Sequence, residues 1–360
     1  MPDPLASSIS SVQSTDPEQA IVEVRRAHEL LKSEIRKIIV GQDDVVDQVL
    51  MCMFCRGHAL IVGVPGLAKT LLISTIARTL SLGFSRIQFT PDLMPSDITG
   101  TEVIEEDKTT GAREFRFVKG PIFANVILAD EINRTPPKTQ AALLESMQER
   151  HVTVGGVQHH LPDPFFVLAT QNPIEQEGTY PLPEAQLDRF MFQIHIAYPT
   201  VEEEAEIVRR SATKAGVRID AVLSNQDILR VQALVAQCPV ADHVIAYALR
   251  LVRATRVRGA EDGPRPKIVS DYVGWGAGPR ASEYMVLSAK ASAILSGQVH
   301  VAPEHIRAVA KPILRHRILT NFNAEADQVT TDDIIDELLE SIPVEGTSAD
   351  EQKQMDAVMR

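Results

Sequence analysis

The sequence predicts an α/β domain with a parallel sheet, followed by a second domain made of helices. Three observations support this fold class. Short apolar runs alternate with helical patterns up to about Tyr198, as in a parallel sheet with crossover helices. Three of these runs end in polar residues, at the strand end where α/β proteins bind ligands. From Thr200 onward the apolar positions recur at helical spacing.

The first apolar run, residues 59–62, leads into a glycine-rich turn and then into a helical pattern over residues 71–78. The turn is Gly63-Val64-Pro65-Gly66-Leu67-Ala68-Lys69-Thr70. Strand, glycine-rich turn and helix form the context of a phosphate-binding P-loop. The two glycines allow phosphates to approach backbone N–H groups at a helix N-terminus, where the potential is positive. Alternatively, the segment is an ordinary turn that joins a strand to a helix.

Three residues of this turn, Ala68, Lys69 and Thr70, determine what it can bind. Lys69 can reach the β and γ phosphates of a nucleotide, and the Thr70 hydroxyl can bind Mg²⁺. Ala68 departs from the usual pattern, because glycine is expected at this position. Alanine is small enough to be tolerated there. The sequence therefore predicts that residues 63–70 bind the phosphates of ATP together with Mg²⁺.

The second apolar run, residues 125–129, ends in two carboxylates, Asp130 and Glu131. A continuous apolar run is typical of a fully buried strand. We expect Asp130 to hold Mg²⁺ through its water shell. We expect Glu131 to act as the general base that polarises the attacking water. Alone, such an ending commonly marks a strand that runs into a solvated turn.

The third apolar run, residues 165–170, is followed by Gln171, Asn172 and Pro173. The neutral amide of Asn172 can orient the attacking water or contact the γ-phosphate. An asparagine before a proline is also ordinary turn chemistry. We favour the functional interpretation, because the ending also matches what a P-loop ATPase places at this point.

Two arginines complete the predicted site. Arg189 follows a short helix that starts near Pro183, and Arg280 lies at the start of a later helix. Either guanidinium can neutralise charge that develops on the γ-phosphate. The alternative for each is a surface ion pair.

Taken together, these segments resemble the MoxR-type AAA+ ATPases. The resemblance rests on residues 63–70, 126–149, 169–190 and 278–282, and it extends from about Val40 into the helical part. It implies a five-stranded parallel sheet flanked by helices and an all-α lid domain. MoxR-type loops usually have alanine at the position of Ala68, so this departure supports the assignment.

The resemblance also implies a role for each site residue. Lys69 and Thr70 would belong to Walker A, Asp130 and Glu131 to Walker B. Asn172 would be sensor 1, Arg280 would be sensor 2, and Arg189 would be an arginine finger that serves the neighbouring subunit. Gly41 and Gln42 would pack beside the adenine.

By the same resemblance we expect an ATP-hydrolysing, chaperone-like ring, most often a homo-hexamer, that remodels or activates protein complexes. Such ATPases often act with a partner that has a von Willebrand factor A domain, and they help to mature or insert metal cofactors. One alternative is a nucleic-acid-translocating motor of the same fold. Another is a nucleotide-sensing scaffold with little turnover. The sequence does not identify the client.

Charge and hydropathy restrict the class of partner. The net charge is −12 and the pI is about 5.4, whereas a dedicated nucleic-acid binder would have a basic surface. The N-terminal residues lack a basic leader followed by an apolar core, and no apolar run approaches membrane-spanning length. We therefore expect a cytoplasmic protein that neither binds nucleic acid nor inserts into a membrane.

The remaining segments predict the domain limits. We expect a disordered tail over residues 1–18, an α/β domain over 19–199, a helical domain over 200–345 and a polar tail over 346–360. Two β-hairpins should interrupt the α/β domain, at about 101–120 and 150–161; Gly155-Gly156 forms the turn of the second. We expect His159-His160 on its solvated surface. A Gly/Pro-rich loop over 258–279 should return Arg280 to the nucleotide.

Overall fold

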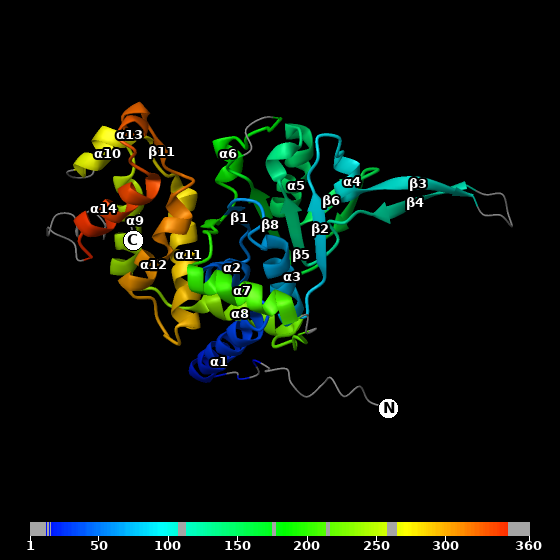
Figure 1. The fold of residues 1–360 in the computed structure, drawn as a ribbon, viewed down its shortest axis with the longest axis horizontal. Helices are drawn as coiled ribbons and strands as arrows, with labels where there is room; N and C mark the ends of the chain where they lie inside the picture. The colour runs from blue at the N-terminus through cyan, green and yellow to red at the C-terminus, as the bar shows by residue number, and fades with distance from the viewer. Residues whose placement is uncertain are drawn as a thin grey trace.

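The protein is described by a computed structural model that covers residues 12, 14, 16–106, 113–174, 178–213, 217–257 and 265–344. Its centre is a sheet of five parallel strands, in the order β2-β5-β8-β1-β9 (Figure 1). The strands are β1 (Ala59–Val62), β2 (Phe84–Gln88), β5 (Val126–Asp130), β8 (Phe166–Gln171) and β9 (Phe192–His195). The predicted five-stranded parallel sheet is confirmed. The three apolar runs form its three central strands.

The first helices flank this sheet. They are α1 (Pro17–Arg36), α2 (Asp43–Phe54), α3 (Lys69–Thr79), α4 (Pro95–Thr99), α5 (Pro137–Glu149) and α6 (Glu184–Leu187), with a 3₁₀ turn at Ile132–Arg134. Helix α1 begins with a proline in its first turn and buries one apolar face. Most of the disordered tail predicted over 1–18, and the whole polar tail predicted over 346–360, lie outside the described residues. The described part of the first tail departs from the prediction. Pro17 and Glu18 belong to α1, and buried Val12 donates its N–H to Asp227 Oδ1 over 3.3 Å.

The second half of the chain is helical, as predicted. Its helices are α7 (Val201–Thr213), α8 (Asn225–Gln237), α9 (Asp242–Ala254), α10 (Lys267–Tyr272), α11 (Pro279–Leu295), α12 (Pro303–Leu314), α13 (Phe322–Ala326) and α14 (Thr331–Ser341).

The prediction of a loop over 258–279 is wrong for the part that the structure describes. Residues 265–279 contain α10 and a short strand, β10 (Val273–Trp275), which pairs antiparallel with β11 (Leu319–Thr320). A helix of six residues has too few turns to show apolar periodicity, so the glycines and prolines dominated the pattern.

Both predicted hairpins are confirmed. One consists of β3 (Gly100–Glu106) and β4 (Arg113–Lys119), and it projects away from the sheet (Figure 1). The other consists of β6 (His151–Val154) and β7 (Val157–His160), joined by Gly155 and Gly156 with φ of 58° and 81°. His159 is not simply solvated surface. Its ring stacks on Phe117 of the first hairpin, with centroids 3.9 Å apart.

The α/β domain and the lid share one apolar core. Buried residues of β9, of α2 and of the lid helix α11 belong to a single cluster, and α11 packs against α1, α2, α8, α9 and α12. Cys52 and Cys55 are buried in this cluster, and Cys55 Sγ lies 3.4 Å from the Leu287 carbonyl of α11. In the part of the chain that the structure describes, no helix is both long enough and apolar enough to cross a bilayer.

Candidate nucleotide-binding site

The carboxyl ends of three adjacent strands bring the predicted site together. In the sheet, Val62 of β1 pairs with Gln171 of β8, and Ala129 of β5 pairs with Ala169 of β8. The Gly63 N–H points to the Gln171 carbonyl at 3.4 Å. The P-loop, the Asp130–Glu131 pair and Asn172 therefore lie along one edge of the sheet, where an α/β fold binds its ligand.

Backbone geometry explains the residues of the P-loop. Gly66 has a φ of 87°, and a Cβ at this position would meet nothing within 4 Å, so open space borders the loop. A Cβ on Gly63 would lie 3.0 Å from the Ile196 carbonyl, closer than side chains normally pack. Ala68 caps α3 with a φ of 54°, in the left-handed region that costs an L-residue about 1–2 kcal/mol. The alanine that departs from the usual glycine is thus held in a conformation that favours glycine.

Lys69 extends back across the loop. Its Nζ donates a hydrogen bond to the Gly63 carbonyl, so the ammonium group lies inside the turn that residues 63–69 form. Burial lowers the pKa of Lys69, and the charges of Asp130 and Glu131 act in the opposite direction. The cation is therefore held in the loop, within electrostatic range of the two carboxylates.

Asp130 is held by two groups that the sequence did not reveal. Its Oδ1 accepts a hydrogen bond from Thr170 Oγ1 over 2.6 Å, and its Oδ2 forms an ion pair with Arg86 Nη2 at 2.6 Å. Thr170 Oγ1 also accepts the Glu131 N–H over 2.8 Å. One hydroxyl on β8 thus fixes both the carboxylate of Asp130 and the backbone of Glu131.

Glu131 has a φ of 58°, which turns the chain sharply at the end of β5. Its Oε2 accepts a hydrogen bond from Gln88 Nε2 over 2.7 Å and lies 3.2 Å from Arg134 Nη1. Gln88 is the register partner of Asp130 on the neighbouring strand β2. Gln88 and Arg86 could be placed beside Glu131 and Asp130 only once strand β2 was known.

The donor set fits Mg²⁺. The Thr70 hydroxyl, in the first turn of α3, and the Asp130 carboxylate both supply hard oxygen atoms, which this ion prefers. Both come from segments that meet at the same sheet edge. They are the residues that would hold the ion beside the phosphates.

Asn172 lies at the same edge, and its side chain forms the turn contact that one of the two interpretations predicted. Its side chain is buried, with 5% of its surface exposed, and its Oδ1 accepts the Ile174 N–H over 3.1 Å. This bond is the Asx turn expected before Pro173. The amide is therefore held rigidly at the edge of the sheet, directly after the strand that contains Thr170.

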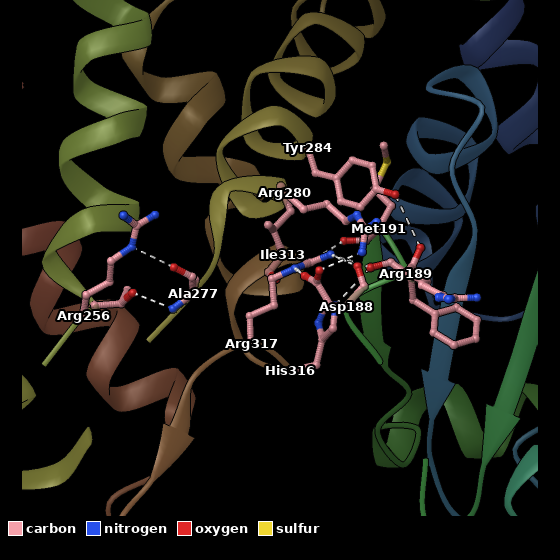
Figure 2. Close-up of polar contacts among 12 residues, drawn as sticks. Asp188, Arg189, Met191, Arg256, Ala277, Arg280, Tyr284, Ile313, His316 and Arg317 are labelled. Atoms are coloured by element: carbon pink, nitrogen blue, oxygen red, sulfur yellow. Dashed lines mark hydrogen bonds and ion pairs between the residues drawn. The ribbon is translucent and has the colours of Figure 1, made fainter. Parts of the chain in front are cut away.

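The two arginines lie at the junction with the lid (Figure 2). Arg280, the second residue of α11, pairs through Nη1 with Asp188 Oδ2 at 2.8 Å. Arg189 directs its Nη1 to the Leu144 carbonyl of α5 at 3.4 Å. The structure thus engages both guanidinium groups with protein partners.

Gly41 and Gln42 form the turn that precedes α2, with φ values of 67° and 60°. Glu203 of α7 packs so closely on Gly41 that a Cβ there would lie 2.1 Å from its Oε1. The Oε1 atom of Gln42 is buried and has no hydrogen-bond partner among the described residues. A buried amide oxygen without a donor is compatible with a ligand that supplies one.

Comparison with known proteins places the chain in a family. Residues 58–192 match the model of the ATPase family associated with various cellular activities (AAA), and residues 265–338 match the AAA lid domain. The chaperone MoxR1 of Mycobacterium tuberculosis is 44% identical over 319 residues, which cover 88% of this chain and 82% of that protein. The chain belongs to the MoxR family of AAA+ ATPases.

Other relatives agree with this MoxR-family assignment. Protein MoxR of Methylorubrum extorquens is 30% identical over 335 residues, or 89% of this chain and 95% of that protein. A crystal structure of a candidate ATPase from Cytophaga hutchinsonii superposes with a TM-score of 0.83 at 42% identity. That similarity covers 91% of this chain and 97% of the other. The predicted family and fold are therefore confirmed, including the lid.

Proposed function

We propose that this MoxR-family protein is an ATP-hydrolysing, ring-forming motor that remodels or activates protein complexes in a chaperone-like way. The observation that carries the proposal is the shared sheet edge. A P-loop with an inward-facing lysine, a carboxylate pair and a buried amide meet there. The family assignment and the chaperone name of a relative with 44% identity support the chaperone part.

The residues at this edge divide the chemistry among them. Lys69 and the N–H groups of residues 63–70 would bind the phosphates and neutralise their charge. Thr70 and Asp130 would hold Mg²⁺, which supplies further charge neutralisation when bound. Glu131 would accept the proton of the attacking water, and Asn172 would orient that water.

The arginines connect the site to assembly. We propose that Arg280 senses the γ-phosphate in its own subunit and that Arg189 serves the nucleotide of a neighbouring subunit. This role requires a second subunit within reach, so the active form would be a homo-oligomer, most simply a hexamer. A von Willebrand factor A domain protein is the partner class we propose, and maturation or insertion of a metal cofactor is the process.

One experiment tests this proposal against its alternatives. A Glu131→Gln variant should retain ATP and hold its client, so that affinity capture with ATP, compared with capture without nucleotide, identifies the client. A remodelling motor should retain a protein complex in the ATP sample. ATPase activity stimulated by single-stranded DNA would favour a nucleic-acid motor instead. ATP binding without phosphate release by the wild type, under conditions that form oligomers, would favour a sensing scaffold.

A further inference from the structure

One carboxylate at the junction of the two domains is shared by two arginines of the lid (Figure 2). Asp188 follows α6, directly before Arg189. Its Oδ2 accepts from Arg280 Nη1 over 2.8 Å, and its Oδ1 accepts from Arg317 Nε over 2.7 Å. Two further lid residues, Tyr284 and His316, contact the carbonyls of Arg189 and Phe190 beside it. We call Asp188, Arg280, Tyr284, His316 and Arg317 the Asp188 junction. Sequence analysis assigned no role to Asp188.

The two arginines are held very differently. The Arg317 side chain is 2% exposed, and its guanidinium also donates to the carbonyls of Asp188, Phe190, Met191 and Ile313 over 2.5–3.2 Å. It lies 5.2 Å from the ring of Tyr284. Arg280 is 38% exposed, and the structure gives it a single bond to the carboxylate. Partly exposed pairs contribute little, so Arg280 can exchange its partner while Arg317 stays in place.

The same junction holds the backbone on both sides of Arg189. The Tyr284 hydroxyl lies 3.4 Å from the Arg189 carbonyl, and His316 Nε2 lies 3.1 Å from the Phe190 carbonyl. Arg280 and Tyr284 are four residues apart on α11, so they lie on one face of that helix. The position of the lid therefore determines where the segment around Arg189 lies.

We propose that Asp188 is a positioning residue that retains Arg280 when nucleotide is absent and couples the lid to the Arg189 segment. The carboxylate and the phosphates of ATP compete for one guanidinium. Phosphate carries the larger charge and takes Arg280, while Arg317 continues to hold Asp188. Binding in one subunit is thereby linked, through residues 188–189, to the arginine offered to the next. This inference rests on the proposed function.

The test is the affinity for a fluorescent ATP analogue, measured in a double-mutant cycle. Asp188→Asn keeps the shape and an acceptor oxygen for Arg317 but removes the charge that retains Arg280. We expect the variant to bind the analogue about two- to fivefold more tightly, since a partly exposed ion pair is worth up to about that factor. The gain should disappear in an Arg280→Ala background. A purely structural role would not make the change depend on Arg280.

A second variant keeps the test valid if Asp188→Asn fails to fold. Asp188→Asn leaves the buried charge of Arg317 without its counter-ion, which can destabilise the fold. Asp188→Asn with Arg317→Gln removes both charges and should show the same gain in affinity. Unchanged or weaker binding in the folded variants, or a gain that persists without Arg280, would overturn the proposal. If the wild type fails to bind the analogue, or Lys69→Ala binds it equally well, the proposed function itself is wrong.

Discussion

The Gln88 side chain donates a hydrogen bond to Glu131 Oε2 over 2.7 Å, from the neighbouring strand β2. The proposed general base thus accepts a hydrogen bond from another side chain of the protein. Arg134 Nη1 lies 3.2 Å from the same oxygen atom. An oxygen that already accepts from such donors has less capacity left to accept a hydrogen bond from the attacking water.

The first prediction follows from this bond. Gln88→Ala should raise the turnover number of ATP hydrolysis by up to about tenfold, because one hydrogen bond is worth about 0.5–1.5 kcal/mol. Nucleotide affinity should stay unchanged, since Gln88 contacts Glu131 and Arg86 rather than the P-loop. Steady-state kinetics and a binding titration measure both quantities. A lower turnover number would mean that Gln88 orients Glu131 for the reaction instead of restraining it.

The second prediction concerns Lys69 and Glu131. Lys69→Ala should abolish ATP binding, because the phosphates lose the cation of the P-loop. Glu131→Gln should bind ATP but hydrolyse it about 10²–10⁴-fold more slowly, because an amide cannot accept the proton of water. Phosphate release and equilibrium binding distinguish the two variants. Wild-type turnover by Glu131→Gln would remove this residue from the role of general base.

Whether the sequence revealed a residue of this site depended on how deeply the strand that carries it is buried. The central strands β1, β5 and β8 are covered on both faces, so they form continuous apolar runs, and the residues that follow them were found. The outer strands β2 and β9 are only partly buried and show no such run. Gln88 and Arg86 were missed for this reason. Asp188 and Arg317 were missed because 129 residues separate them in the chain.

The third prediction is a pH dependence of stability that arises at His58. Burial lowers the pKa of this imidazole from 6.5 to about 4. Its Nδ1 accepts the Val167 N–H over 3.0 Å, and its Nε2 lies 3.1 Å from the Met147 carbonyl, so the neutral ring satisfies both partners. Protonation would place a second N–H against that of Val167.

The sign follows from the lowered pKa. Above pH 6.5 the ring is neutral in both states and its contribution to stability is complete. As the pH falls from 6.5 toward 4, the His58 imidazole becomes protonated in the unfolded chain but stays neutral in the folded chain. The free energy of unfolding should therefore decrease by about 3 kcal/mol over this range. Urea unfolding at a series of pH values measures the slope, which should be shallower in His58→Gln. An equal slope in that variant would assign the effect to other groups, such as buried His316.

The fourth prediction concerns the β6–β7 hairpin. Replacing residues 154–157 with a short polar turn should leave basal ATPase mostly intact and weaken the action on the client. The hairpin supplies no proposed phosphate ligand, and its His159 contacts Phe117 of the projecting β3–β4 hairpin. ATPase assays and client capture in the Glu131→Gln background test both parts. If the variant unfolds or loses nucleotide binding, the hairpin has a structural role.

The last prediction tests whether Arg189 acts on a neighbouring subunit. Its guanidinium is a planar, permanently charged donor that suits a phosphoryl transition state. If Arg189 served its own subunit, Arg189→Ala and Lys69→Ala proteins would both be inactive, and mixing them would change nothing. If it acts across an interface, an Arg189→Ala subunit retains its P-loop and a Lys69→Ala neighbour can offer the missing arginine. Mixed rings should then regain part of the activity.

The expected defect of the unmixed Arg189→Ala protein is large, because arginine fingers contribute about 10³–10⁵ in rate. Native mass spectrometry, with and without a slowly hydrolysed ATP analogue, should establish both the ring and the presence of both variants within it. A monomer with full ATPase activity under all conditions would exclude the ring. Confirmed mixing without recovery would leave Arg189 in the role that its contact with the Leu144 carbonyl already shows, a link between the Asp188 junction and helix α5. Recovery, in contrast, would show that this guanidinium, which has five N–H donors, reaches a phosphate across the interface.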